Sequence, residues 1–229
     1  MLHVCSTPQE QIERLVAIVS ETLAQDIRRR GHAVLAVSGG RSPIALFQAL
    51  AVAPIAWEHV TVTLADDRLL PADHADSNAA LVHTHLLQGA AARARFLPVV
   101  DDPNAMAASV ERANARFRAL GQPLTIAVLG MGDDGHTASL FPGAAQIGDG
   151  LDPAYPAPYL GLIPPHAPYP RITLSVAELL RAGRLLLSIA GETKRAVYTR
   201  ASTPPPRADL PISFVMQQQT TPFDAYWAP

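Results

Sequence analysis

The densest run of potentially reactive side chains lies near the middle of the chain, where residues 130–136 read Gly-Met-Gly-Asp-Asp-Gly-His. This run follows an apolar segment, so we expect a loop beyond the end of a strand. A histidine in such a loop can exchange a proton near neutral pH, which makes His136 a candidate general base. Asp134, two residues earlier, is placed to orient the imidazole. A hydrogen-bonded structural histidine is the alternative interpretation.

Residues 130–135 also fit the G-x-G-x-x-G pattern of dinucleotide-binding loops, but the surrounding residues argue against that function. Asp133 and Asp134 would put negative charge where a pyrophosphate should lie. The few residues between Gly135 and Phe141 leave no room for the long helix that the pattern requires, and the acidic residue expected after a next strand is missing. We therefore reject the dinucleotide interpretation.

A second candidate site follows an earlier apolar run and points to anion binding. Its residues are Ser38, Gly39, Gly40, Arg41 and Ser42. The two glycines allow the backbone to approach a ligand closely, and we expect Ser42 to cap a helix that opens with Pro43. Backbone amides at a helix start favour an anion, most naturally a phosphate. No Gly-Lys-Ser/Thr follows, so this is not a Walker A loop. A tight turn that needs glycine is the alternative.

Two further groups of charged residues follow predicted strands. Asp66 and Asp67 precede Arg68, and burying such a group is costly unless the charges are paired or used. Arg68 is suited to grip a phosphate or a carboxylate, and Asp66 is a candidate for proton transfer. Lys194 opens a later helix and is placed to meet the same phosphate. The alternatives are a solvated turn for the first group and a solvated lysine for the second.

The elements that must position these residues alternate along the chain. Apolar spacing predicts helices over 8–30, 43–51, 77–88, 104–120, 192–201 and 211–218. Short apolar runs predict strands over 33–37, 60–65, 124–129, 171–175, 184–190 and 222–227. This alternation predicts an α/β fold, a single Rossmann-like domain over residues 1–229 with a mostly parallel sheet and helices on both faces. Ligands in such sheets bind beyond the carboxyl ends of the strands, where the candidate residues fall.

The stretch from Phe141 to Pro170 breaks this pattern. It has no clear periodicity, and prolines crowd its second half. A structureless stretch of this length is usually functional or mobile. Two interpretations stay open, an inert surface insertion and a wall or flap beside the active site.

The composition and charge of the chain exclude several classes of protein. Of the 229 residues, 48% are hydrophobic and 17% are charged, which excludes a disordered chain. The net charge of −2 offers no basic excess for nucleic acid, and the aliphatic runs are too short to span a bilayer. One cysteine, Cys5, excludes an internal disulfide and a cysteine zinc site. We expect a cytoplasmic protein with no nucleic-acid or membrane partner.

Five segments together resemble the family that contains 6-phosphogluconolactonase and glucosamine-6-phosphate deaminase. They are Ser38-Gly-Gly-Arg-Ser-Pro43, Asp66-Asp-Arg68 with Ser77-Asn78 downstream, residues 129–142, Arg171-Ile-Thr-Leu-Ser175 and Gly191-Glu-Thr-Lys194. They occur in the family's order and span most of the chain. The segment 129–142 is the most specific. This chain departs from the family in having Asp67 where glutamate is usual and Ser42 where threonine is usual, changes that keep the charge or the hydroxyl.

The resemblance implies hydrolysis of 6-phospho-D-glucono-1,5-lactone in the oxidative pentose phosphate pathway, with no required metal or nucleotide cofactor. In the mechanism that we hypothesise, His136 takes a proton from water and returns it to the ring oxygen, Asp134 and Asp66 assist, and amides near Gly39-Gly40 or Gly132 hold the oxyanion. The residues expected to hold the substrate phosphate are Ser38, Gly39, Gly40, Arg41, Ser42, Arg68, Arg171 and Lys194. The expected partner is a small phosphorylated sugar lactone, and the expected state is a monomer.

Two other functions are compatible with parts of the sequence. One is a sugar-phosphate deaminase or isomerase. The deaminase segment after this loop looks like Asp-Gly-His-Ile-Ala-Phe-Asn-Glu-Pro, and its glutamate helps ring opening. Residues 137–142 of this chain supply no such glutamate. A non-catalytic sugar-phosphate sensor would bind the phosphate and lose nothing on substitution of His136. Such a sensor usually carries a DNA-binding segment, and no basic helix-turn-helix is evident.

Overall fold

Seven strands form a fully parallel sheet, and at one place in the strand order the chain connections leave two adjacent strands in opposite directions. The computed structural model describes residues 1–229. Across the sheet the strands are β1 (Leu2–Val4), β10 (Phe223–Ala228), β9 (Leu185–Ala190), β6 (Ile126–Leu129), β2 (Ala33–Val37), β3 (Val60–Leu64) and β5 (Arg95–Leu97). The chain runs outward from β2 to β3 and β5, then returns to β6 on the other side of β2 and runs outward to β9 and β10. Connections therefore leave β2 and β6 in opposite directions, and open α/β sheets bind ligands at such a switch point.

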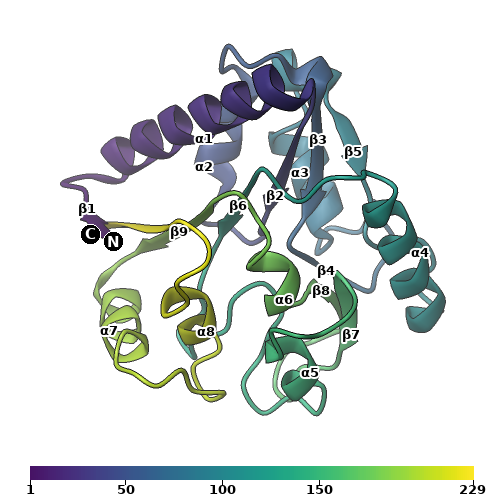
Figure 1. Cartoon of the computed structure of the whole chain (residues 1–229), viewed down its shortest axis with the longest axis vertical. Coiled ribbons are helices and arrows are strands. Elements are labelled where there is room, and N and C mark those ends of the chain that lie inside the picture. The colour runs from purple at the N-terminus through teal and green to yellow at the C-terminus, as the bar shows by residue number, and fades with distance from the viewer.

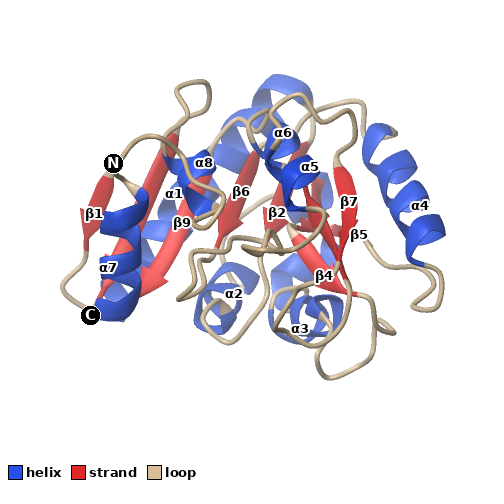
Figure 2. Ribbon diagram, turned by 90° about the horizontal axis from the view of Figure 1, so that it is seen from below, coloured by secondary structure: helices blue, strands red, loops and turns tan.

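Helices cover the sheet in two layers (Figures 1 and 2). Contacts join α1 (Pro8–Arg30), α2 (Ile44–Ala51) and α3 (Asn78–His85) into one layer, and α6 (Val176–Leu179), α7 (Glu192–Ala201) and α8 (Ile212–Met216) into another. Right-handed crossovers that run in opposite directions place these layers on opposite faces. The remaining helices are η1 (Trp57–His59), η2 (Gly89–Arg93), α4 (Met106–Arg118) and α5 (Ile147–Leu151). The predicted α/β architecture is confirmed. None of the helices is both long and apolar enough to cross a bilayer.

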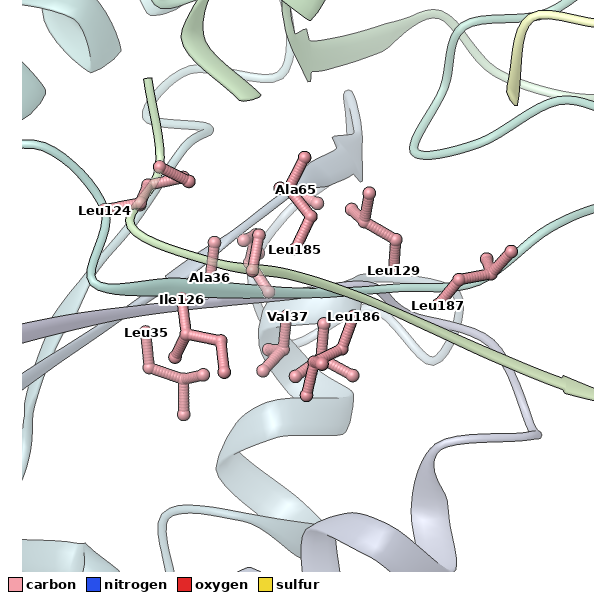
Figure 3. Close-up of a cluster of buried hydrophobic side chains, with 14 of the residues drawn as sticks. Leu35, Ala36, Val37, Ala65, Leu124, Ile126, Leu129, Leu185, Leu186 and Leu187 are labelled. Carbon is pink, nitrogen blue, oxygen red and sulfur yellow. The ribbon is translucent and has the colours of Figure 1, made fainter. Parts of the chain in front are cut away.

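The central strands are buried on both faces, which is why residues 33–37 form a continuous apolar run. All five residues of β2 are buried, and the neighbouring strands β3 and β6 are also buried throughout. Figure 3 shows Leu35 and Val37 projecting to one side of the sheet and Ala36 to the other. Alternate side chains of β2 therefore pack under both helical layers, which holds the carboxyl end of the strand rigidly.

The first predicted helix has the expected ends, but the second does not. Thr7 Oγ1 accepts a hydrogen bond from the amide of Glu10, and Gly31 ends α1 with φ 78°. In contrast, α2 begins at Ile44, after Pro43, with no side-chain cap. The expected cap at Ser42 is therefore wrong. The amide of Ile44 bonds to the carbonyl oxygen of Arg41, so a turn separates the glycine loop from the helix.

A smaller antiparallel sheet corrects two of the predictions. It consists of β4 (Asp66–Arg68), β8 (Arg171–Leu174) and β7 (Tyr159–Leu162). The solvated turn considered for Asp66 and Asp67 is wrong, because both side chains are buried in β4. The stretch before Pro170 is not structureless, since it contains α5 and β7. The buried Tyr159 of β7 donates its hydroxyl hydrogen bond to the carbonyl oxygen of Leu64, so the segment is no inert insertion.

Glu178 in α6 is a buried carboxyl away from the carboxyl ends of the central strands. Its side chain is 5% exposed, and its nearest cation is Arg181, with 3.6 Å between Oε2 and Nη1. Burial raises the pKa of Glu178 from 4.5 to about 7, and the charge of Arg181 offsets only part of this effect. Between these two pH values the folded protein holds a proton that the unfolded chain releases.

Stability should therefore fall as pH rises through this window, because the folded state binds more protons than the unfolded state. We expect Glu178→Gln to remove this contribution. The free energy of unfolding of the variant, relative to wild type, should rise by roughly 2–3 kcal/mol between pH 5 and pH 8. Urea unfolding at both pH values measures the difference. The exposed Glu111→Gln is the matched control and should follow wild type. Parallel curves for Glu178→Gln and wild type would contradict the assignment.

Candidate active site

A cavity of about 310 Å³ opens at the switch point, beyond the carboxyl ends of β2 and β6. Its volume lies in the range of small-molecule sites. Of the eleven predicted site residues, Asp134 lies outside the lining, and the other ten line the cavity: Ser38, Gly39, Gly40, Arg41, Ser42, Asp66, Arg68, His136, Arg171 and Lys194. Of the stretch from Phe141 to Pro170, Phe141 alone lines the cavity, so any wall that this stretch forms is limited to its first residue.

The loop after β2 has the properties of an anion-binding site. The backbone amides of residues 39–42 donate no hydrogen bond within the protein. Gly40 has φ 96°, a conformation that favours glycine, and a Cβ atom at Gly39 would lie 1.8 Å from Oδ1 of Asn78. The hydroxyl of Ser38 is buried without a partner. Successive free amides in such a loop form a concave site for an anion.

Arginine side chains supply the positive charge of the same cavity. Arg171 is 5% exposed, and its Nε and Nη1 atoms have no hydrogen-bond partner. Arg68 lies opposite it in the antiparallel pair of β4 and β8. Burial and the neighbouring Arg68 guanidinium lower the pKa of Arg171, whereas the carboxylates of Asp66 and Asp67 raise it. An unpaired buried cation is costly, so the arrangement calls for an anionic ligand.

The balance of charge around the cavity is strongly positive. Four cationic side chains line it, and Asp66 is the one carboxylate among the lining residues. Lys194 reaches the cavity from the first turn of α7. Asp66 is itself buried, and its Oδ2 accepts a hydrogen bond of 2.5 Å from Ser139 Oγ. A dianionic ligand would offset the excess charge.

Asp67 does not line the cavity but fixes residues that do. Its carboxylate accepts hydrogen bonds from the amides of Arg68, Asn78 and Ala79 and from Ser77 Oγ, at 2.7–3.1 Å. Burial raises the pKa of Asp67 to about 6, against the opposing effect of these hydrogen bonds. The aspartate therefore ties the start of α3 to β4. Asn78 in turn donates to the carbonyl oxygen of Asp66 at 2.8 Å.

The imidazole of His136 is held by an acidic neighbour. The distance from Nδ1 to Asp134 Oδ1 is 2.6 Å, and the same oxygen accepts the backbone amide of His136. Burial alone would raise the pKa of Asp134, but the hydrogen bonds from His136 hold it below its usual range. A neutral ring that donates from Nδ1 keeps Nε2 free to accept a proton, and His136 lines the cavity.

Gly132 makes room for this pair and corrects one expectation. A Cβ atom at Gly132 would lie 2.2 Å from Cε1 and Nδ1 of His136, so a side chain there would displace the ring. The amide of Gly132 donates to the carbonyl oxygen of His136 at 2.9 Å, so this amide itself is not free to hold an oxyanion. Residues 130–135 form a tight turn without opening a helix, which agrees with rejecting the dinucleotide pattern.

The sequence did not indicate several of the lining residues as site residues, among them Asn78, Ser139, Phe141 and Ser188. Ser188 carried a usable signal, since it interrupts an apolar strand near its carboxyl end. Asn78 carried a weaker signal, because an asparagine at a helix start is commonly structural. No group of three or more His, Cys, Asp or Glu side chains is arranged to hold a metal ion.

Comparison with known proteins identifies the family. A model of the glucosamine-6-phosphate isomerases/6-phosphogluconolactonase family matches residues 6–227. The chain belongs to this family. A 6-phosphogluconolactonase of Mesorhizobium japonicum is 43% identical over 94% of this chain and 90% of its own length. One of Rhizobium meliloti is 39% identical over 100% of this chain and 98% of its own.

Solved structures of the family share the architecture. The crystal structure of a 6-phosphogluconolactonase from Shewanella baltica has a TM-score of 0.97 and 35% identity, and covers 100% of this chain and 97% of its own. A monomeric glucosamine-6-phosphate deaminase has a TM-score of 0.79 at 17% identity, covering 99% of this chain and 96% of its own. The fold is therefore common to both activities of the family, and the site must distinguish them.

The unpaired guanidinium of Arg171 leads to a prediction about ligand-dependent stability. Arg171→Met should leave the melting temperature unchanged or higher without anions, because an uncompensated buried charge is removed. Inorganic phosphate should raise the melting temperature of wild type but not of the variant. Thermal unfolding with phosphate, and with sodium chloride at equal ionic strength, tests this. As a control, Arg184→Met breaks the pair with Asp224 outside the cavity and should keep the phosphate effect. An equal phosphate effect in Arg171→Met would refute the assignment.

Proposed function

We infer that this chain is an enzyme that hydrolyses 6-phospho-D-glucono-1,5-lactone to 6-phospho-D-gluconate, a step of the oxidative pentose phosphate pathway. Relatives matched over nearly its whole length carry the name 6-phosphogluconolactonase. The single observation that carries the mechanism is the His136–Asp134 pair beside a cavity lined by four cationic side chains. We propose that residues 1–229 act as one lactonase domain. Because one chain supplies the whole cavity, we also propose a monomer.

The substrate phosphate is bound by the cationic side of the cavity. The free amides of residues 39–42 form its cradle, and Ser38 adds a hydroxyl. Arg171 and Lys194 supply charge-assisted hydrogen bonds, with Arg68 beside them. The phosphate lies far from the reacting carbon of the lactone, so its binding serves to fix the ring relative to His136.

His136 acts as the general base. Nε2 accepts a proton from a water molecule as the water oxygen bonds to C1, which gives a tetrahedral oxyanion. The bond from C1 to the ring oxygen then breaks, and the protonated imidazole returns its proton to that oxygen. Asp134 keeps Nδ1 protonated and stabilises the charged ring between the two transfers. Asp66, the one lining carboxylate, is proposed to take part in proton transfer next to the ring.

The residues that line the cavity also favour lactone hydrolysis over deamination of an amino-sugar phosphate. No glutamate lines the cavity, whereas the deaminases of the family carry one after the corresponding loop that helps ring opening. Hydrolysis of the lactone has no amino-sugar ring-opening step, so it does not require that glutamate.

Replacement of the base tests the mechanism directly. We expect His136→Ala to lower kcat by about 10²- to 10⁴-fold with little change in affinity for 6-phosphogluconate, because the ring contributes to proton transfer rather than to phosphate binding. Decay of freshly prepared lactone, followed by NMR at slightly acidic pH, measures the rate above spontaneous hydrolysis. The exposed His166→Ala is the control and should behave as wild type. A wild-type kcat in His136→Ala would remove this residue from the mechanism.

Replacement of Lys194 should affect binding instead. We expect Lys194→Ala to raise KM by about 10- to 100-fold while kcat changes less than about threefold, as for a lost charge-assisted hydrogen bond made equally in substrate and transition state. The effect should vanish with the unphosphorylated lactone, which has no group for the lysine to bind. Arg200→Ala, in the last turn of the same helix, is the control. A fall in kcat with unchanged KM would contradict the binding role.

A further inference from the structure

Phe141 lies between the two halves of the site, and the mechanism so far does not use it. Its ring stacks on the imidazole of His136, with 4.2 Å between centroids and 28° between planes. The guanidinium carbon of Arg171 lies 6.0 Å from the centre of the same ring. One apolar side chain thus contacts both the base and a cation assigned to the phosphate.

The imidazole is restricted on three sides. Asp134 fixes Nδ1 at its edge, the backbone of Gly132 lies against Cε1 and Nδ1, and the ring of Phe141 covers a face. Asp134 alone would leave the ring free to turn about its hydrogen bond. The contact with Phe141 removes that freedom, because a stacked ring must slide or separate before the imidazole can turn.

The position of Phe141 is itself firmly determined. The chain reverses between His136 and Phe141 through Ala138, which has φ 48°, and the amide of Leu140 bonds to the carbonyl oxygen of Thr137. Leu140 is fully buried. This turn brings the phenyl ring back over the imidazole that precedes it by five residues.

Two further hydrogen bonds attach the turn to the small sheet. The amide of Ser139 bonds to Thr173 Oγ1 in β8 at 3.1 Å, and its hydroxyl bonds to Asp66 in β4. The strands that carry Arg68 and Arg171 therefore also hold the turn that presents Phe141. The base and the cations share one support.

We propose that Phe141 is a positioning residue, whose ring holds the imidazole of His136 in the orientation that directs Nε2 at the water molecule that attacks C1. This inference rests on the proposed lactonase function. It acts through His136 and requires no contact between Phe141 and substrate. A planar aromatic ring is the essential property, because an aliphatic side chain of similar volume fills the space without offering a flat surface.

Kinetics of Phe141→Leu and Phe141→Tyr separate this role from simple packing. We expect Phe141→Leu to lower kcat per folded enzyme by about 10- to 100-fold with KM within about threefold of wild type, as for a misplaced catalytic group. Phe141→Tyr keeps the ring and should retain at least about a third of kcat. Equal losses in both variants, or a wild-type kcat in Phe141→Leu, would overturn the proposal. If Phe141→Leu does not fold, Phe141→Met replaces it with the same expectation.

The chain offers a matched control outside the cavity. Phe96 in β5 also packs against a histidine, His83, with 4.7 Å between ring centroids. Phe96→Leu should reduce stability and leave kcat per folded enzyme unchanged. A loss of kcat in Phe96→Leu equal to that in Phe141→Leu would show a general effect of lost aromatic packing and would refute a specific role.

A spectroscopic measurement makes the test independent of activity. The ¹⁵N chemical shifts of the His136 ring report which nitrogen holds the proton, and resonances are assigned by their loss in His136→Ala. In wild type and Phe141→Tyr we expect the form protonated on Nδ1. In Phe141→Leu the shifts should move toward those of the exposed His166. Unchanged shifts in Phe141→Leu would overturn the proposal even where kcat falls. An inactive wild type with the expected shift pattern would instead disprove the lactonase function and leave the positioning of the ring intact.

Discussion

The repulsion between two neighbouring guanidinium groups is the constraint around which the site is organised. Arg68 and Arg171 face each other across an antiparallel pair of strands, and no side chain of the protein pairs with Nε or Nη1 of Arg171. Such a pair stays together only if the backbone forces it to. The small sheet provides that force through the β4–β8 ladder, through β7 on the far side and through Asp67, which fixes the backbone next to Arg68. The protein thus keeps a destabilising arrangement, as is common at functional sites, and the proposed partner of these cations is the substrate phosphate.

The other half of the site follows the opposite principle, because the protein itself supplies the contacts that orient His136. The imidazole has its carboxylate partner at Nδ1, its glycine neighbour and its aromatic cover within the same chain. Binding energy from the remote phosphate therefore need not reorganise the base. A preorganised base with an incomplete anion site matches a reaction in which the phosphate positions the substrate but does not react.

The sequence predicted the inner strands of the large sheet and β8 of the small sheet, but it missed the edge strands β1 and β5 and the other two strands of the small sheet. Strands such as β2 and β9 are buried on both faces, and their continuous apolar runs stand out from the flanking loops. The strands β1, β4 and β5 have three residues each, which is too short for any periodicity to be visible. β4 is also made of charged residues, which sequence patterns associate with solvent. Long-range hydrogen bonds, such as the one that Ser139 donates to Asp66, compensate for the cost of burying these charges. A local sequence pattern does not reveal such bonds. The site residues were predictable because glycine, histidine and charged residues gathered at predicted strand ends. Asp67 shared that signal, but its role in fixing α3 to β4 depends on long-range hydrogen bonds, and Phe141 gave no signal of this kind.

The pairing of β1 with β10 joins the first strand of the chain to the last. The amino group of Met1 bonds to the carbonyl oxygen of Phe223, and Gln11 at the start of α1 donates to the carbonyl oxygens of Ile189 and Tyr226. During synthesis on the ribosome, β2, β6 and the loops that form the cavity emerge well before β10. The edge strand β1 and the start of the longest helix therefore wait for β10. Completion of the sheet is thus a late event, and β1, although made long before β10, finds its place only after β10 has formed.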